Sequence, residues 1–169
     1  MAKCGWARPE SSVKNKITAQ IAASALTERY LKSIREDRGY AYSVEADAMF
    51  NDVYNDYTLL VLCPFIPEKC DSILLLISHD IHALAEHGVT PDELQKAKEY
   101  QQKVYTDNQK SNPYWNSAIE NLIVWGRDEH TPYLRTLQDI TPADVSRFIK
   151  QHVLHDGQCT NVIMLPQAQ

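Results

Sequence analysis

Apolar residues recur at helical spacing over residues 17–36, near the start of the chain. They stand at Ile17, Ile21, Ala25, Leu26, Leu31 and Ile34. This spacing, in an alanine-rich stretch, predicts an amphipathic helix with one buried face. Gly39 follows at a point where a helix ends readily on a residue that tolerates a left-handed backbone, so we expect it to form a structural turn.

Two stretches after this helix have the composition of strands. Residues 40–46 have the alternating pattern of side chains that is typical of a strand, and they include β-forming types. Residues 57–63 are nearly all apolar, as in a central strand. Asparagine and aspartate residues between positions 51 and 56 favour a turn, so the two stretches predict an antiparallel hairpin with a rather long loop. A final strand is predicted over residues 161–165, before Pro166.

The remaining sequence has helical patterns separated by clear breaks. Helices are predicted over residues 67–86, 94–109, 114–125, 131–137 and 145–153. The sequences TPDE at 90–93 and TPAD at 141–144 each combine a threonine N-cap, a proline in the first turn and an acid at the positive end of the helix dipole. The order of elements predicts an α+β fold, with helices packed on one face of an antiparallel sheet.

The predicted sheet has few strands for the number of helices, and its edges would be exposed. We therefore expect this chain to lack the first strand of the fold, which a partner or another segment would supply. Residues 1–16 have little pattern and are interpreted as a poorly structured lead-in, and residues 17–169 as a single domain. An unpaired sheet edge also predicts a possible contact between two copies of the chain, a homodimer through the sheet edge.

Composition narrows the class of partner. The net charge is -5 and no basic stripe occurs, which argues against nucleic acid because phosphate binding needs a surplus of lysine and arginine. No apolar stretch approaches the roughly 18 residues that span a bilayer, so we expect a soluble chain without a membrane partner. The four cysteines form no C-x-x-C pair and are interpreted as buried free thiols.

Several sequence blocks resemble, in the right order, the C-terminal half-domain of the pitrilysin/insulinase-type zinc metallopeptidases. Residues 31–44, LKSIREDRGYAYSV, are similar to the family pattern L-R-E-x-x-G-x-A-Y-x-V. The Pro67-Glu68 helix start, the block GVTPDELQKAK at 88–98, and ITPADV at 140–145 followed by NVIMLP at 161–166 also fit. The resemblance covers residues 17–166, whereas residues 1–16 do not resemble the strand and helix with which the family's domains begin.

The resemblance implies a half-domain of the pitrilysin/mitochondrial processing peptidase type. In such enzymes two homologous halves enclose a polypeptide, and one half holds zinc beside a glutamate that activates the metal-bound water. The half similar to this chain binds substrate and closes the chamber. The expected partners are therefore an N-terminal zinc-binding half of the same protein and a peptide substrate. The compartment stays open, and is periplasmic or extracellular if an upstream signal exists.

The resemblance also implies roles for particular residues. An arginine and a tyrosine at the spacing of Arg35 and Tyr42 reach from this half into the active site, where they contact substrate backbone or help to stabilise the oxyanion. Gly39 would set the direction in which the two side chains point. The alternative is structural: Arg35 is then a solvated cation at a helix end, and Tyr42 a strand residue packed by its ring.

The zinc motif H-x-x-E-H is absent from the sequence. The nearest string runs from His82 to His87, and its extra residue rotates the two histidines about 140° apart on a helix. His79 and His82 with Glu86 remain as an alternative site on one helix face. We expect no metal in this chain and no peptide hydrolysis by it alone. A non-catalytic interaction or assembly module derived from the same family is the competing interpretation.

Overall fold

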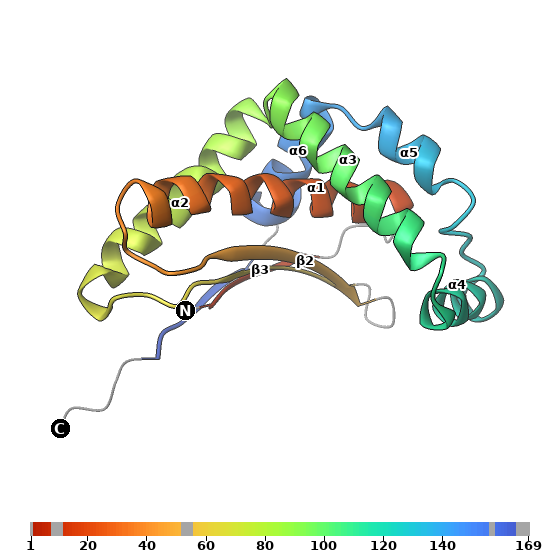
Figure 1. Ribbon diagram of the computed structural model, residues 1–169, viewed down its shortest axis with the longest axis horizontal. Coiled ribbons are helices and arrows are strands. Elements are labelled where there is room, and N and C mark those ends of the chain that lie inside the picture. Colours follow the sequence, from red (N-terminus) through yellow and green to blue (C-terminus); the bar gives the residue numbers. More distant parts are fainter. Residues whose placement is uncertain (1, 8–11, 52–55, 156–157, 165–169) are drawn as a thin grey trace.

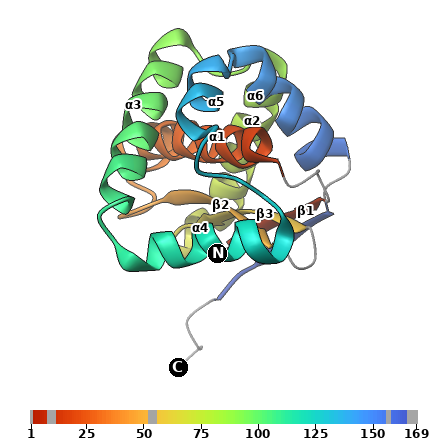
Figure 2. The same cartoon turned by 90° about the vertical axis from the view of Figure 1, so that its right-hand side faces the viewer.

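The computed structural model describes residues 2–7, 12–51, 56–155 and 158–164. Its strands form one antiparallel sheet in the order β2-β3-β1-β4. The strands are β1 (Ala2–Ala7), β2 (Glu45–Asn51), β3 (Asp56–Leu62) and β4 (Gln158–Val162). The helices gather on one face of this sheet, and the helix at Asn112–Trp125 lies beyond its end (Figures 1 and 2). The predicted α+β fold with helices on one face of an antiparallel sheet is therefore confirmed.

The helical segments follow the predicted order with shifted ends. They are α1 (Val13–Tyr30), the π-helical turn η1 (Leu31–Glu36), the 3-10 turn η2 (Pro67–Lys69), α2 (Cys70–His87), α3 (Pro91–Asn108), α4 (Asn112–Trp125), α5 (Tyr133–Asp139), α6 (Pro142–Phe148) and the π-helical turn η3 (Ile149–His155). Ser12 caps α1 by accepting the backbone N–H of Asn15 at 3.2 Å. The first helix therefore begins four residues earlier than residue 17, where the apolar pattern starts.

The interpretation of residues 1–16 as a lead-in, and the expected absence of a first strand, are wrong for residues 2–7. These residues form β1, which pairs with β3 on one side and β4 on the other. The segment is short and lacks a clear alternation, so its strand character comes from the two neighbours that hydrogen-bond to it. Both neighbours are distant in sequence, and local patterns do not report such pairing. Residues 1 and 8–11 lie outside the described part of the chain.

The predicted strand over residues 40–46 is also displaced. Regular pairing begins at Glu45, and before it the chain makes an isolated antiparallel bridge between Ala41 and Phe65. Ala41 and Val44 are both buried, so the alternation that suggests a strand reflects two core contacts in a connecting segment. This segment carries Tyr42, which therefore lies between η1 and β2 rather than inside the sheet.

Helix α1 is the centre of the core. It packs on the sheet through β2 and is covered on its other sides by α2, α3, α5 and α6. Ile17, Ile21 and Leu26 are almost fully buried, and alanines at intervening positions let the neighbouring helices approach closely. Because α1 is enclosed, the position and direction of η1 at its end are fixed by the core.

Arg29 on α1 ties this central helix to the start of α3. Its guanidinium donates to both carboxylate oxygens of Glu93, at 2.7 and 2.9 Å, and to the carbonyl of Gly88 at 3.1 Å. Glu93 also closes the capping box of α3 with Thr90. Burial pushes the pKa of Glu93 upward, but hydrogen bonds from Arg29 and Thr90 hold the pKa below its ordinary value.

Candidate functional site

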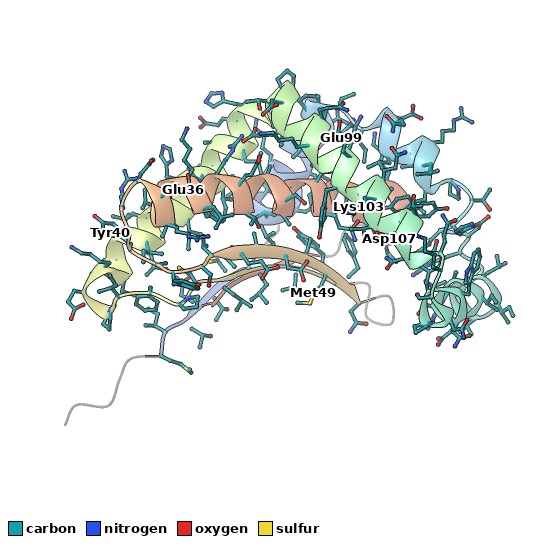
Figure 3. All side chains as sticks on the ribbon, viewed as in Figure 1. Glu36, Tyr40, Met49, Glu99, Lys103 and Asp107 are labelled. Atoms are coloured by element: carbon teal, nitrogen blue, oxygen red, sulfur yellow. The ribbon has the colours of Figure 1, made fainter. Side chains whose placement is uncertain are left out.

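Arg35 and Tyr42 lie side by side on the surface at the end of the α1–η1 helix. The guanidinium carbon of Arg35 is 5.8 Å from the centre of the Tyr42 ring, within the range of a cation–π contact. Tyr42 is 86% exposed. Their neighbours Glu36 and Tyr40 are labelled in Figure 3 at this end of the molecule. The structure thus brings together the two residues that the sequence singles out.

A turn with a defined geometry connects the pair. The helix ends through three backbone hydrogen bonds, from Asp37 to Lys32, from Gly39 to Arg35 and from Tyr40 to Ile34, at 2.9 to 3.0 Å. Gly39 has a φ of +65°, in the left-handed region where a residue with a Cβ is strained. Arg35 and Tyr42 therefore lie on either side of a reversal that depends on this glycine.

Core residues on both sides hold the turn in place. Ile34 is fully buried one residue before Arg35, and Ala41 is buried one residue before Tyr42. The backbone N–H of Ile66 donates to the carbonyl of Tyr40 at 3.2 Å, which joins the turn to the segment after β3. The Tyr40 ring also lies 5.3 Å from the Lys69 amine. Arg35 and Tyr42 each directly follow one of these buried anchors, and both side chains are exposed.

The pair combines a permanent cation with a hydroxyl donor. Within the described residues neither side chain makes a hydrogen bond or ion pair, and their mutual ring contact is the interaction that holds them together. The guanidinium can donate to a carbonyl or carboxylate through several N–H groups in one plane, and the hydroxyl can donate to an oxygen whose negative charge grows. The arrangement suits the binding of a polypeptide backbone or an oxyanion brought to this surface.

The histidines of α2 are engaged in local contacts. His79 Nδ1 is 3.1 Å from Oδ1 of Asp80, and His82 Nδ1 is 2.8 Å from the carbonyl of Ser78 on its own helix. Glu86 instead faces His87, at 3.7 Å. In the part of the chain that the structure describes, no three His, Cys, Asp or Glu side chains gather in a way that could hold a metal ion. The alternative site of His79, His82 and Glu86 therefore does not assemble.

The two sheet edges differ in how their backbone groups are used. On β2, the Thr27 hydroxyl accepts the N–H of Ala46 at 2.9 Å and donates to its carbonyl at 3.2 Å. Asp47 accepts the N–H of Ala48 at 2.8 Å. The opposite edge strand, β4, pairs with β1 alone among the described strands. Pairing with a second chain is thus blocked over residues 46–48 and is open only at other parts of the edges.

Sequence reasoning misses the π-helical turn that carries Arg35. A π-helical turn follows no spacing of apolar residues, so local sequence does not signal it, although such turns often occur at functional sites. The contacts of Tyr40 with the segment at 65–69 are missed for the same reason, because they join residues distant in sequence. No helix among the described residues has the length and apolar character needed to cross a membrane.

The sequence matches the family described as the peptidase M16 inactive domain over residues 2–100, more than half of the chain. The match begins in β1 and includes Arg35, Gly39 and Tyr42. A search of curated proteins by sequence finds no significant match.

Solved structures with the same fold include both short and long chains. The periplasmic protease PqqL from Escherichia coli has a TM-score of 0.74 and 22% identity, and the alignment covers 92% of this chain and 18% of PqqL. An inactive peptidase domain from Bordetella parapertussis has a TM-score of 0.75 and 14% identity, with 99% and 92% of the two chains covered. The ferredoxin protease FusC, solved in complex with Arabidopsis ferredoxin, has a TM-score of 0.73 and 13% identity, with 90% and 17% covered. This chain therefore spans under a fifth of the two proteases and nearly all of the Bordetella domain.

Proposed function

Because the chain belongs to the family of peptidase M16 inactive domains, we propose that it is the substrate-binding, chamber-closing half of a zinc-dependent metallopeptidase that degrades peptides or polypeptides. The zinc and the residues that activate water lie in another half, which encloses the substrate together with this chain. Arg35 and Tyr42 face that enclosed space. We propose that the chain forms one such half-domain. Its N-terminal boundary lies at β1 rather than at residue 17.

The exposed Arg35–Tyr42 pair is the observation that carries this proposal. A solvated arginine on an ordinary helix end gains little from facing an exposed aromatic ring. Here a buried core, a reversal at Gly39 and a backbone bridge fix the backbone from which both side chains extend, and the two side chains contact each other at the surface. A backbone that is already in place brings both donors to one position, and this lowers the entropy cost of orienting them toward a substrate.

Peptide hydrolysis by the assembly with the zinc-binding half tests the assignment. Arg35→Ala and Tyr42→Phe are expected to lower kcat/KM by roughly 10- to 1000-fold, the range seen when one donor to a developing oxyanion is removed. Thermal stability should change little because both side chains are exposed. Lys32→Ala is a matched control, since it removes the same charge from an exposed side chain three residues away. Wild-type rates in both site variants would remove the proposed role.

A non-catalytic interaction or assembly module is the second candidate, and a different observation favours it. Helix α4 has no buried residue, and it exposes apolar side chains at Ile119, Leu122, Ile123 and Val124. Apolar surface of this kind is typical of a protein contact. If this function is the correct one, no zinc-binding half accompanies the chain in its parent protein, and Arg35→Ala leaves every partner bound. The presence or absence of an H-x-x-E-H helix in the complete reading frame decides between the two candidates.

A further inference from the structure

A cleft distinct from the Arg35–Tyr42 pair opens between helices α1 and α3 and the first residues of edge strand β2. Its volume is about 390 Å³, enough for one or two amino-acid side chains. Helix α3, which forms one wall, carries the labelled Glu99, Lys103 and Asp107 in Figure 3, and Met49 marks β2 below it. The cleft is lined by groups from three segments, so its shape depends on tertiary packing.

A buried amide faces this cleft. Gln101 is only 7% exposed, and its carbonyl oxygen accepts a hydrogen bond from the Tyr133 hydroxyl at 3.3 Å. Its amide nitrogen donates to no other described residue, although the side chain lines the cleft. The nitrogen is not one of the enclosed side-chain atoms left without a partner, so it is open to the cleft and can donate to an acceptor that enters there.

The mouth of the cleft carries uncompensated negative charge. Glu45 and Asp47 line it from β2, and within the described residues neither carboxylate forms an ion pair. Tyr100, which is 59% exposed, adds an aromatic ring on the α3 side, and the buried Ala23 and Ala46 give an apolar floor. Carboxylates, an aromatic face and a small apolar floor together fit a cation at the end of an aliphatic chain.

The backbone of the adjoining edge restricts how a ligand enters. Thr27 occupies both hydrogen-bonding groups of Ala46, and Asp47 occupies the N–H of Ala48. An extended peptide therefore cannot add to β2 as a further strand over these residues. Recognition in the cleft must come from a side chain that enters between α1 and α3.

We propose that this cleft binds a lysine or arginine side chain of a polypeptide. The cation lies between Glu45, Asp47 and Tyr100, the methylene stem lies on the alanines, and the amide of Gln101 donates to a carbonyl of the bound peptide. The inference rests on the proposed function for the polypeptide that carries the side chain. Glu45 is three positions after Tyr42, a backbone span of at most about 11 Å, so one extended peptide can contact both sites.

Binding of capped amino acids to the isotopically labelled chain tests the proposal by NMR. N-acetyl-lysine methylamide and N-acetyl-arginine methylamide are expected to shift the side-chain amide of Gln101 and the backbone signals of Ala46 and Asp47, with saturation. N-acetyl-norleucine methylamide has the same stem without the charge, and should bind at least tenfold more weakly. Equal binding of the norleucine compound, or shifts spread over other surfaces, would overturn the proposal.

Paired variants separate specific recognition from overall charge. The double variant Glu45→Gln and Asp47→Asn should weaken binding of the lysine compound at least tenfold. The asparagine keeps an oxygen that can accept the N–H of Ala48, so the strand edge is preserved. Glu99→Gln with Asp107→Asn removes the same charge from α3 outside the cleft, and should change binding less than twofold. Unchanged binding in the cleft variant refutes the site.

The binding measurement requires no zinc-binding half and no peptidase activity. A failure here leaves the rate effects of Arg35→Ala and Tyr42→Phe untouched, and a failure of those rate effects leaves the cleft able to bind its probe. The two results are therefore independent.

Discussion

Replacing Gly88 with alanine should destabilise the fold more than the same change at Gly39 or Gly126. Gly88 ends α2 with φ +71° and ψ -163°, a backbone region that is essentially restricted to glycine. A Cβ at this position would lie 2.6 Å from the carbonyl oxygen of Pro142, well inside contact distance. Pro142 begins α6, so the obstacle is the backbone of a capped helix rather than a mobile side chain.

The magnitude follows from two separate contributions. The unfavourable backbone region costs about 1–3 kcal/mol, and displacing the start of α6 costs a further 1–3 kcal/mol, similar to overpacking in a core. Gly126 is a matched control, because it also ends a helix with positive φ, +65°, but a Cβ there meets no atom within 4 Å. Gly126→Ala should cost only the left-handed backbone preference, about 1–2 kcal/mol.

Urea unfolding followed by circular dichroism measures both variants against the parent chain. We expect the free energy of unfolding to fall by about 2–6 kcal/mol for Gly88→Ala, and by about 1–2 kcal/mol for Gly126→Ala. The corresponding melting temperatures should fall by about 2–4 °C for each kcal/mol. Equal losses in the two variants would refute the reasoning, because they would show that the contact with Pro142 is absent or relaxes without cost.

Three further predictions concern two ion pairs that join helices, Lys14 with Asp144 and Arg29 with Glu93, and the turn at Gly39. Burial raises the pKa of Asp144, but hydrogen bonds from Lys14 and Thr141 outweigh it and lower the pKa to about 2. The stability from these contacts is therefore present above the unfolded pKa of about 3.9 and is lost as the pH falls toward 2. Asp144→Asn should cost about 1–2 kcal/mol at pH 7, after allowance for the half-exposed Lys14, and urea titrations should show this difference shrinking below about pH 4. Arg29→Ala should lower the free energy of unfolding by about 2–4 kcal/mol in the same assay. Arg29→Lys should lower it by at least half as much, because an ammonium cannot donate to both oxygens of Glu93 and to Gly88 in the same geometry. A lysine variant as stable as the parent chain would contradict this. Gly39 has φ +65° and open space around an added Cβ, so Gly39→Ala should lower the free energy of unfolding by only about 1–2 kcal/mol. The same variant should lower kcat/KM in the assembly, because a changed turn moves Tyr42 relative to Arg35. An unchanged kcat/KM would contradict the dependence of the pair on this turn.

The helices were predictable because their signals are local. The TPDE and TPAD sequences form complete capping boxes at Thr90 and Thr141, as the pattern of residues predicts. The helix-ending glycines at 39, 88 and 126 all have positive φ. Each of these features depends on residues within one or two turns of each other, so the sequence contains all the information that they require.

The first strand and the geometry of the candidate site were not predictable in this way. Strand β1 has little strand pattern and is defined by hydrogen bonds to β3 and β4, which are remote in sequence. Glu45, which the alternating pattern presents as an ordinary strand residue, lines a cleft only because β2 and α3 both pack against α1. Gln101 has no special position in the sequence, and its burial and its hydrogen bond from Tyr133 depend on the packing of α3 against α5.

The sequence by itself determined the helices, their caps, the family and the two residues that form the exposed Arg35–Tyr42 pair, because turn chemistry and helical periodicity act over a few neighbouring residues. Tertiary structure alone decided that residues 2–7 complete the sheet and that Thr27 and Asp47 block part of its edge. It also decided that three segments enclose an acidic cleft. These features arise where distant segments meet, and the free energy that selects them comes from pairing and burial between those segments rather than from the preference of any one of them.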